Sequence, residues 1–219
     1  MAWVAIVPAA GSGTRLRRGE PKALVSLGGR PLLAASLELL RSSGVGRMVV
    51  AGPPERLAEV RALLLRGEEA VPGGATRAES VRRAFASLAP AQGDVVCIHD
   101  AARPLVTASE AAEVMRAAEA TGAAIAATPI VDTVKRIEKG RIVATIDRAG
   151  LWAAATPQAF REEILRRALA LEEEATDEAA LCERLGIPVA IAPISRLAFK
   201  ITTPEDLELA EAVFARRSA

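Results

Sequence analysis

The chain has 219 residues, of which 51% are hydrophobic, 25% are charged and 3% are aromatic, and its formal net charge is +1. This length favours one domain with a sizeable core, and the balanced charge argues against a disordered chain or a general nucleic-acid binder. No uncharged run is long enough for a membrane-spanning helix, and the first residues lack the basic leader of a signal peptide. The two cysteines lack metal-ligand spacing and fit a reducing compartment, so we expect a cytoplasmic protein.

In the first half of the chain, apolar runs typical of strands alternate with segments of helical periodicity. Strands are predicted at residues 3–7, 47–51, 70–71 and 94–98, and helices at residues 31–41, 55–65, 77–88 and 108–120. Two of the helix starts, Thr76 with Glu79 and Thr107 with Glu110, have the spacing of a capping box. The alternation predicts an α/β fold, a Rossmann-like three-layer αβα arrangement around a mostly parallel sheet.

After a strand predicted at residues 123–129, two short alternating runs occur at residues 133–137 and 141–146. They flank Glu138-Lys139-Gly140, a turn signal, and therefore predict a protruding β-hairpin. Such a hairpin has little core of its own. We expect residues 1–219 to form a single domain, with residues 133–146 as a β-arm that packs on a second copy of the chain and makes a homodimer.

The last third of the chain returns to α/β character. Extended segments are predicted at residues 151–155, 189–191 and 197–201, and helices at residues 162–174 and 177–185. A final helix is expected to begin at Thr203-Pro204-Glu205-Asp206, where proline fits the first turn.

A loop rich in small residues, Pro8 to Arg15, follows the first predicted strand. In α/β proteins, loops at the carboxyl ends of strands bind ligands, and small residues let backbone N–H groups approach an anion. The loop does not fit the dinucleotide fingerprint, because Leu16 stands where a third glycine is needed, nor the phosphate loop of nucleoside triphosphatases. Lys22 follows a second turn and is positioned in sequence to reach the same anion.

Short motifs follow one another along the chain in an order and spacing that are specific when taken together. They are Pro8 to Arg15, Pro21-Lys22, Gly73-Gly74 with Arg77 and Ser80-Val81, His99 to Pro104, Asp132 to Lys135, Asp147-Arg148, Thr156 to Gln158, Thr176 to Glu178 and Lys200 to Asp206. With these motifs the chain resembles the nucleotidyltransferases that join a nucleoside triphosphate to a phosphorylated sugar or polyol. Among them it is similar to the 2-C-methyl-D-erythritol 4-phosphate cytidylyltransferases of non-mevalonate isoprenoid biosynthesis.

The resemblance implies that a phosphate oxygen of the polyol attacks the α-phosphorus of CTP and that pyrophosphate leaves. Arg15 and Lys22 match the residues that bind the triphosphate and stabilise the transition state. The implied nucleotide-binding residues are Pro8, Ala9, Ala10, Gly11, Gly13, Arg15, Lys22, Gly74, Ala75 and Ser80. Ala75 departs from the family, which commonly has aspartate at this position. Ser80 has an alternative, purely structural interpretation as a serine in the first turn of a helix.

For the polyol phosphate, the resemblance implies binding by Asp100, Arg103, Thr133, Arg148, Thr156 and Lys200. Thr133 and Arg148 flank the arm and would come from the partner subunit. An alternative for Arg148 is a simple ion pair with Asp147. The implied catalytic residues are Arg15, Lys22, Arg148 and Lys200. Magnesium is expected as a cofactor held mainly by CTP phosphates, without a protein metal ligand.

Three functions remain open at this stage. The first is the cytidylyltransferase, with CTP and a polyol phosphate as partners. The second is ribitol 5-phosphate cytidylyltransferase, which shares the loop, the aspartate-arginine motif and the arm. The third is a noncatalytic nucleotide-binding domain of the same fold. Nucleophilic catalysis by a Ser-His-Asp triad is not indicated, because His99 is the only histidine and no Gly-x-Ser-x-Gly motif occurs; a core role suits His99 better.

Overall fold

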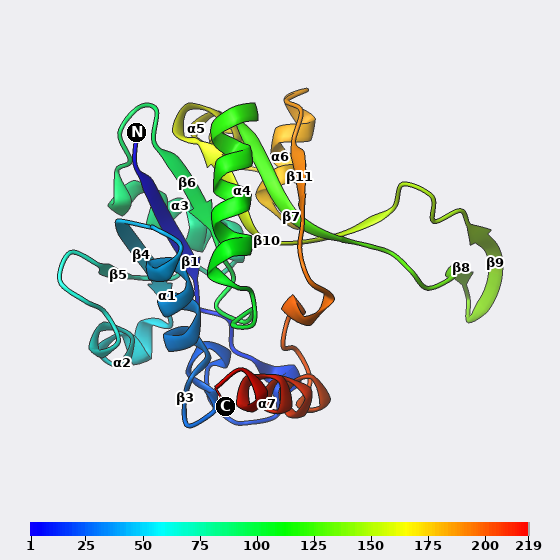
Figure 1. The fold of residues 1–219 in the computed structure, drawn as a ribbon, viewed down its shortest axis with the longest axis horizontal. Helices are drawn as coiled ribbons and strands as arrows, with labels where there is room; N and C mark the ends of the chain where they lie inside the picture. Colours follow the sequence, from blue (N-terminus) through cyan, green and yellow to red (C-terminus); the bar gives the residue numbers. More distant parts are fainter. Residues whose placement is uncertain (219) are drawn as a thin grey trace.

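The computed structural model describes residues 1–218, which fold around a mixed sheet of seven strands. These are β1 (Trp3–Pro8), β4 (Arg47–Gly52), β5 (Glu69–Pro72), β6 (Val95–Ile98), β7 (Ala123–Pro129), β10 (Trp152–Arg161) and β11 (Ala190–Pro193), and their order across the sheet is β11-β7-β10-β6-β1-β4-β5 (Figure 1). Only β10 runs antiparallel to its neighbours among the strand pairs described for this sheet. The sheet is therefore mostly parallel, as predicted.

Helices cover both faces of this sheet. On one face are α1 (Leu32–Ser42), α2 (Leu57–Ala62) and α4 (Ala108–Thr121), and on the other are α3 (Arg77–Leu88), α5 (Glu162–Leu169) and α6 (Glu178–Arg184). Strand β1 shows why, since Ala5 and Val7 pack toward the first group and Val4 and Ile6 toward the second. Successive side chains of a strand point to opposite faces, so a strand that is apolar throughout needs cover on both. The predicted three-layer αβα fold is confirmed.

A third apolar cluster lies below the main sheet. It joins α7 (Pro204–Ser218) to the short hairpin of β2 (Ser26–Leu27) and β3 (Arg30–Pro31) and to Leu16, which is buried at the end of the loop after β1. Through Leu16, this cluster anchors the loop of Pro8 to Arg15. Within the described residues 1–218, no helix combines the length and hydropathy needed to cross a membrane.

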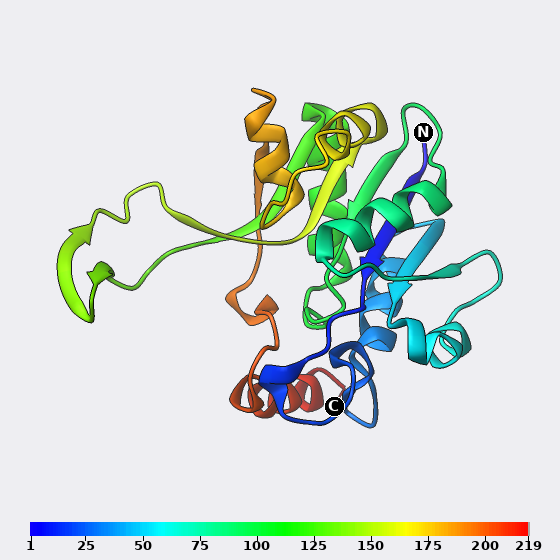
Figure 2. The same ribbon diagram turned by 180° about the vertical axis from the view of Figure 1, so that it is seen from behind.

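The predicted hairpin is present as β8 (Val134–Glu138) and β9 (Arg141–Ile146). The two strands pair only with each other in the described structure and project away from the rest of the chain, as two opposite views show (Figures 1 and 2). Ile137 and Ile142 are 61% and 64% exposed on it. Its role in dimerisation stays a prediction.

Several predicted boundaries were wrong for local reasons. The strand expected at residues 197–201 is absent, and Arg196–Ala198 form a 3₁₀ helix, because the Ser195 hydroxyl accepts from the Leu197 N–H that a sheet would use. The helix expected at residues 162–174 ends at Leu169, and nearby Glu172 has a φ of 53°, which is incompatible with a right-handed helix. The helix expected at residues 55–65 is reduced to α2, preceded by a 3₁₀ turn at Pro54–Arg56.

The two predicted capping boxes differ. At α4, Thr107 and Glu110 form the reciprocal pair as predicted. At α3, Thr76 accepts from the Glu79 N–H at 3.1 Å, but the Glu79 carboxylate accepts from the N–H of Ala75 at 2.7 Å and not from Thr76. Glu79 thus fastens the loop before α3 one residue further back than a capping box would.

The extended segment predicted at 151–155 is longer than expected, since β10 continues to Arg161 and fills the gap between β6 and β7.

Candidate active site

A cavity of about 330 Å³ opens where β1 and β6 end. Four parts of the chain line it: the loop after β1 with Lys22, the loop and first turn of α3, the residues after β6, and the segment before α7. The lining residues are Pro8, Ala9, Ala10, Gly11, Ser12, Gly13, Thr14, Arg15, Lys22, Ala23, Gly74, Ala75, Thr76, Arg77, Ser80, Asp100, Ala101, Ala102, Lys200 and Thr202. The structure thus brings together every residue predicted for the nucleotide, together with Asp100 and Lys200.

The loop after β1 closes tightly on the segment that carries Lys22. The Lys22 N–H donates to the Gly11 carbonyl at 3.2 Å, and a Cβ at Gly13 would lie 2.8 Å from the Cβ of Lys22. Gly13 also has a φ of 67°, which side chains disfavour. Only glycine at this position lets the loop turn and the lysine approach at the same time.

Lys22 is partly buried and lies near two other cations. Burial, together with the charges of Lys200 and Arg15, lowers the pKa of Lys22 to about 8. The lowered pKa means that the charged form of Lys22 is less stable here than in water, and a bound anion would stabilise it. The electrostatics of the cavity therefore favour a ligand with several negative charges.

The loop before α3 is held by contacts within the chain. The Gly74 N–H donates to the Ser80 hydroxyl at 3.0 Å, and that hydroxyl donates to the Thr76 carbonyl at 2.9 Å. A Cβ at Gly73 would lie 2.3 Å from the Cβ of Ala10, so this loop and the loop after β1 are in direct contact. Ser80 lines the cavity and lies in the first turn of α3, and its contact with a nucleotide stays a prediction.

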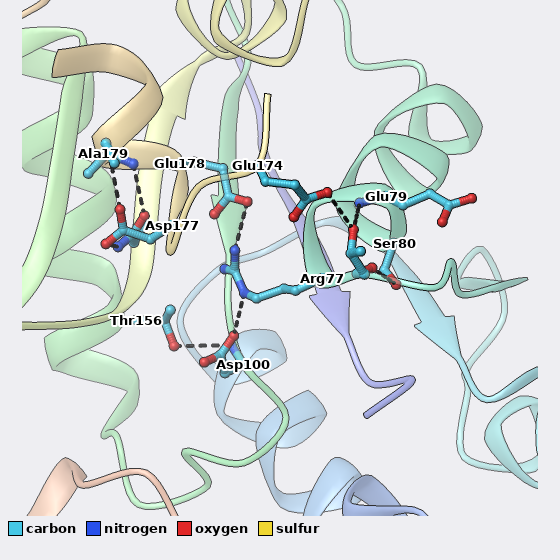
Figure 3. Close-up of polar contacts among 12 residues, drawn as sticks. Arg77, Glu79, Ser80, Asp100, Thr156, Glu174, Asp177, Glu178 and Ala179 are labelled. Carbon is cyan, nitrogen blue, oxygen red and sulfur yellow. Dashed lines mark hydrogen bonds and ion pairs between the residues drawn. The ribbon is translucent and has the colours of Figure 1, made fainter. Parts of the chain in front are cut away.

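Asp100 follows β6 and is the single acidic side chain among the described residues that line the cavity. Its Oδ2 accepts from Lys200 Nζ at 2.6 Å. Its Oδ1 accepts from Arg77 Nε at 3.2 Å, a contact drawn in Figure 3. Burial tends to raise the pKa of this carboxyl, but Arg77 and Lys200 outweigh burial and hold the pKa below its usual range. Asp100 is therefore a fixed carboxylate at neutral pH. Its N–H donates to the hydroxyl of Thr156 at 3.0 Å.

Arg77 has a role that the sequence did not reveal. It lies between two carboxylates, since its Nη1 donates to Glu178 Oε1 at 2.8 Å while its Nε contacts Asp100 (Figure 3). Burial raises the pKa of Glu178 although Arg77 opposes the shift. Both residues lie within quoted motifs, but the partners are 101 positions apart, so only the fold could reveal the pair.

His99 is fully buried beneath the cavity, with its Nδ1 3.5 Å from the Thr156 hydroxyl. Burial lowers the pKa of His99 to about 4, so its ring is neutral at physiological pH. This environment fits the core role favoured from the sequence.

Four residues predicted for the polyol phosphate lie outside the cavity lining. Thr156 lies behind Asp100, where the pairing of β10 with β7 shifts register between Ala154 and Gln158. Arg103 donates to the Ala198 carbonyl at 3.1 Å, and burial lowers its pKa. Thr133 and Arg148 lie at the base of the arm, where Arg148 donates to the Val131 carbonyl and Asp147 accepts from the Ala149 N–H. One chain by itself does not bring all six residues together.

The chain's own residues do not fit a magnesium cage. No group of three or more His, Cys, Asp or Glu side chains in the described part of the chain is arranged to hold a metal ion. In the cavity, the two carboxylate oxygens of Asp100 are each engaged by a cation.

A mostly parallel α/β sheet with a small-residue loop after its first strand, and with cations and one carboxylate gathered where its strands end, is the arrangement in which α/β proteins bind anionic nucleotides, and it fits the class of nucleotidyltransferases. Residues 3–216 match the family model for 2-C-methyl-D-erythritol 4-phosphate cytidylyltransferase. The chain belongs to this family, and it is thus a cytidylyltransferase of the non-mevalonate isoprenoid pathway.

Individual relatives agree with this assignment. A 2-C-methyl-D-erythritol 4-phosphate cytidylyltransferase of Frankia casuarinae is 48% identical over 217 residues, covering 97% of this chain and 81% of that protein. The crystal structure of the enzyme of that name from Thermus thermophilus is 35% identical, with a TM-score of 0.81 and coverage of 97% of this chain and 98% of that one. A crystal structure of 4-diphosphocytidyl-2C-methyl-D-erythritol synthase has a TM-score of 0.85 at 34% identity, with the same coverage of both chains.

Proposed function

We propose that the cavity holds CTP with its triphosphate against the loop after β1. The observation that carries this proposal is that Lys200, from near the end of the chain, converges on Arg15 and Lys22 in the loop region after β1. Burial and the other two charges lower the pKa of Lys22. Cations that repel one another at close range are stabilised by a polyanion. Backbone N–H groups of a loop after a strand add further donors for phosphate oxygens.

In the proposed reaction, an oxygen of 2-C-methyl-D-erythritol 4-phosphate attacks the α-phosphorus of CTP. A new P–O bond forms, the bond from the α-phosphorus to the bridging oxygen of the β-phosphate breaks, and pyrophosphate leaves with that electron pair. No side chain becomes a nucleophile, so the protein supplies positioning and charge. Arg15 and Lys22 stabilise the negative charge that builds up around the α-phosphorus.

We assign recognition of cytosine to the segment of Gly74, Ala75 and Ser80. The N–H groups of Gly74 and Ala75 already donate to Ser80 and Glu79. The carbonyl oxygens of Gly74 and Ala75 are then the groups suited to the base, because a carbonyl accepts from the amino group of cytosine and is repelled by the carbonyl of uracil. This arrangement replaces the aspartate that the family commonly has at position 75.

We assign the polyol phosphate to Asp100, Lys200, Thr156 and Arg103 of one chain and to Thr133 and Arg148 of a second. Asp100 accepts from substrate hydroxyls, and the arginine fork of Arg148 suits a phosphate. The arm projects away from the rest of the chain (Figures 1 and 2), and Thr133 and Arg148, which flank its two strands, do not line the cavity of their own chain. In a homodimer, each arm would bring its Thr133 and Arg148 to the partner's cavity, so that all six residues meet in one active site. Residues 1–219 then act as one domain, with residues 133–146 as its dimerisation arm.

Magnesium is part of the proposal as a cofactor bound through triphosphate oxygens and water, which is its usual mode with nucleotides. It would neutralise part of the triphosphate charge.

A cytoplasmic location is proposed on the two buried free thiols, Cys97 and Cys182, which a reducing compartment preserves.

The experiment that tests the function is pyrophosphate release with each of the four nucleoside triphosphates against 2-C-methyl-D-erythritol 4-phosphate and ribitol 5-phosphate. We expect turnover with CTP and the methylerythritol phosphate, at least about a hundredfold above every other pair in kcat/KM. Preference for ribitol 5-phosphate would establish the second candidate. Nucleotide binding without release of pyrophosphate from any pair would establish a noncatalytic domain.

A further inference from the structure

Glu178 is a buried acid that the proposed reaction does not use. It is the first residue of α6, it is 2% exposed, and its Oε1 accepts from Arg77 Nη1 at 2.8 Å. Its Oε2 is buried and has no hydrogen-bond partner within residues 1–218. Burying a carboxylate costs desolvation that a single ion pair often does not return, so stability is a weak explanation for this position.

Another explanation lies in what Arg77 touches on its other side. Glu178, Arg77, Asp100 and Lys200 form a continuous chain of alternating charges that ends in the cavity (Figure 3 shows the first three). Each member comes from a different part of the fold: α6, the start of α3, the end of β6 and the segment before α7. The guanidinium group of Arg77 contacts both Glu178 and Asp100 and so links the two carboxylates.

The two contacts of Arg77 are unequal. The guanidinium lies 2.8 Å from Glu178 and 3.2 Å from Asp100, whereas Lys200 lies 2.6 Å from Asp100. Arg77 therefore pairs more closely with Glu178 than with Asp100, and Asp100 pairs more closely with Lys200 than with Arg77. Without the charge of Glu178, Arg77 would pair with Asp100 alone, draw its carboxylate away from Lys200 and compete with hydroxyl groups for Oδ1.

We propose that Glu178 is a positioning residue for the polyol phosphate, which holds Arg77 so that Asp100 keeps the orientation and the free acceptor capacity that substrate hydroxyls require. Glu178 touches neither substrate in this scheme. The inference rests on the proposed function of Asp100 as a ligand of the polyol.

The decisive variant is Glu178→Gln, which keeps the shape and one acceptor oxygen but removes the charge. Glu162→Gln is a matched control, because Glu162 is also the first residue of a helix, is 4% exposed, and pairs with one arginine, Arg166, at 2.5 Å. That pair lies within α5 and has no member in the cavity lining. Kinetics with each substrate varied in turn, and thermal unfolding, are measured for both variants.

For Glu178→Gln we expect the KM for 2-C-methyl-D-erythritol 4-phosphate to rise about tenfold while the KM for CTP changes less than about twofold. Glu162→Gln should leave both KM values near wild type. Glu178→Asp restores the charge and should bring the polyol KM back to within about threefold of wild type.

An unchanged polyol KM in folded Glu178→Gln, or an equal rise of both KM values, would overturn the proposal and leave a structural ion pair. If Glu178→Gln does not fold, Arg77→Lys decides in the same assay, because an ammonium group cannot bridge two carboxylates as a fork does. A rise confined to the polyol KM then supports the proposal, and no rise overturns it. Failure of the proposed function would show differently, as wild-type protein that releases no pyrophosphate.

Discussion

Binding of CTP should weaken as the pH rises through about 8, and the substitution Lys22→Arg should abolish that dependence. The pKa of Lys22 in the free protein is lowered to about 8 by burial and by the neighbouring charges of Lys200 and Arg15. CTP stabilises the charged form, so it binds best where Lys22 is already protonated. The affinity is therefore complete below the pKa of Lys22 and is lost as the pH rises through it.

The size of the effect follows from this pKa. A group with a pKa of about 8 is charged in about nine-tenths of the molecules at pH 7 and in about one-tenth at pH 9. If bound CTP returns the pKa of Lys22 to its ordinary value of 10.5, each binding event at pH 9 requires protonation of a mostly neutral lysine. The Kd for CTP should then be about tenfold higher at pH 9 than at pH 7, or about 1.4 kcal/mol.

Calorimetric titration of CTP in magnesium-containing buffer at several pH values between 7 and 9 measures this directly. Lys22→Arg is the control, because a guanidinium group stays charged throughout this range and the ionisation of CTP is the same for both proteins. A Kd for wild-type protein that does not change between pH 7 and pH 9 would refute the reasoning. A parallel weakening in Lys22→Arg would assign the titration to another group.

Four further predictions concern individual parts of the site. Arg15→Ala should lower turnover about a hundredfold or more while circular dichroism shows an intact fold, since it removes a fixed charge from the reacting phosphates. Gly13→Ala should lower kcat/KM roughly tenfold or more, because its Cβ would lie 2.8 Å from that of Lys22; normal kinetics would show that the loop can yield. Arg148→Lys should reduce kcat/KM for the polyol phosphate about ten- to a hundredfold and leave calorimetric CTP affinity unchanged; equal damage to both substrates would move Arg148 to the nucleotide side. Mixing inactive Lys22→Ala with inactive Arg148→Ala protein should restore part of the activity through hybrid dimers, and absence of recovery after verified subunit exchange would contradict a shared site.

The gathering of the residues proposed for the nucleotide could be predicted from the sequence because most of them are close together along the chain. Pro8 to Arg15 follow a strand whose carboxyl end must face ligands in an α/β sheet, and Lys22 comes one turn later. The structure places all of them on one cavity. Gly74 and Ser80 are brought there by the next loop that ends a parallel strand, at the same edge of the sheet.

The charge network around Asp100 could not be predicted, because its pairs are distant in sequence. Arg77 lies 23 positions from Asp100 and 101 from Glu178, and charged residues give no periodic signal that identifies their partners. The strand predicted at residues 197–201 failed for a similar reason. Its apolar composition suits a strand, but the hydroxyl of Ser195 satisfies a backbone N–H locally, a contact that composition does not reveal.

In the proposed reaction, this cavity directs a phosphate oxygen of the polyol onto the α-phosphorus of CTP. The most direct test uses 2-C-methyl-D-erythritol 4-phosphate labelled with ¹⁸O in its phosphate group, unlabelled CTP and ³¹P NMR of the products, in which the label shifts the phosphorus signals. All of the label should be found in the cytidyl diphosphate product, partly in the new bridging position, and none in pyrophosphate. Label in pyrophosphate, or a labelled polyol phosphate that is recovered unchanged while CTP is hydrolysed, would contradict the account.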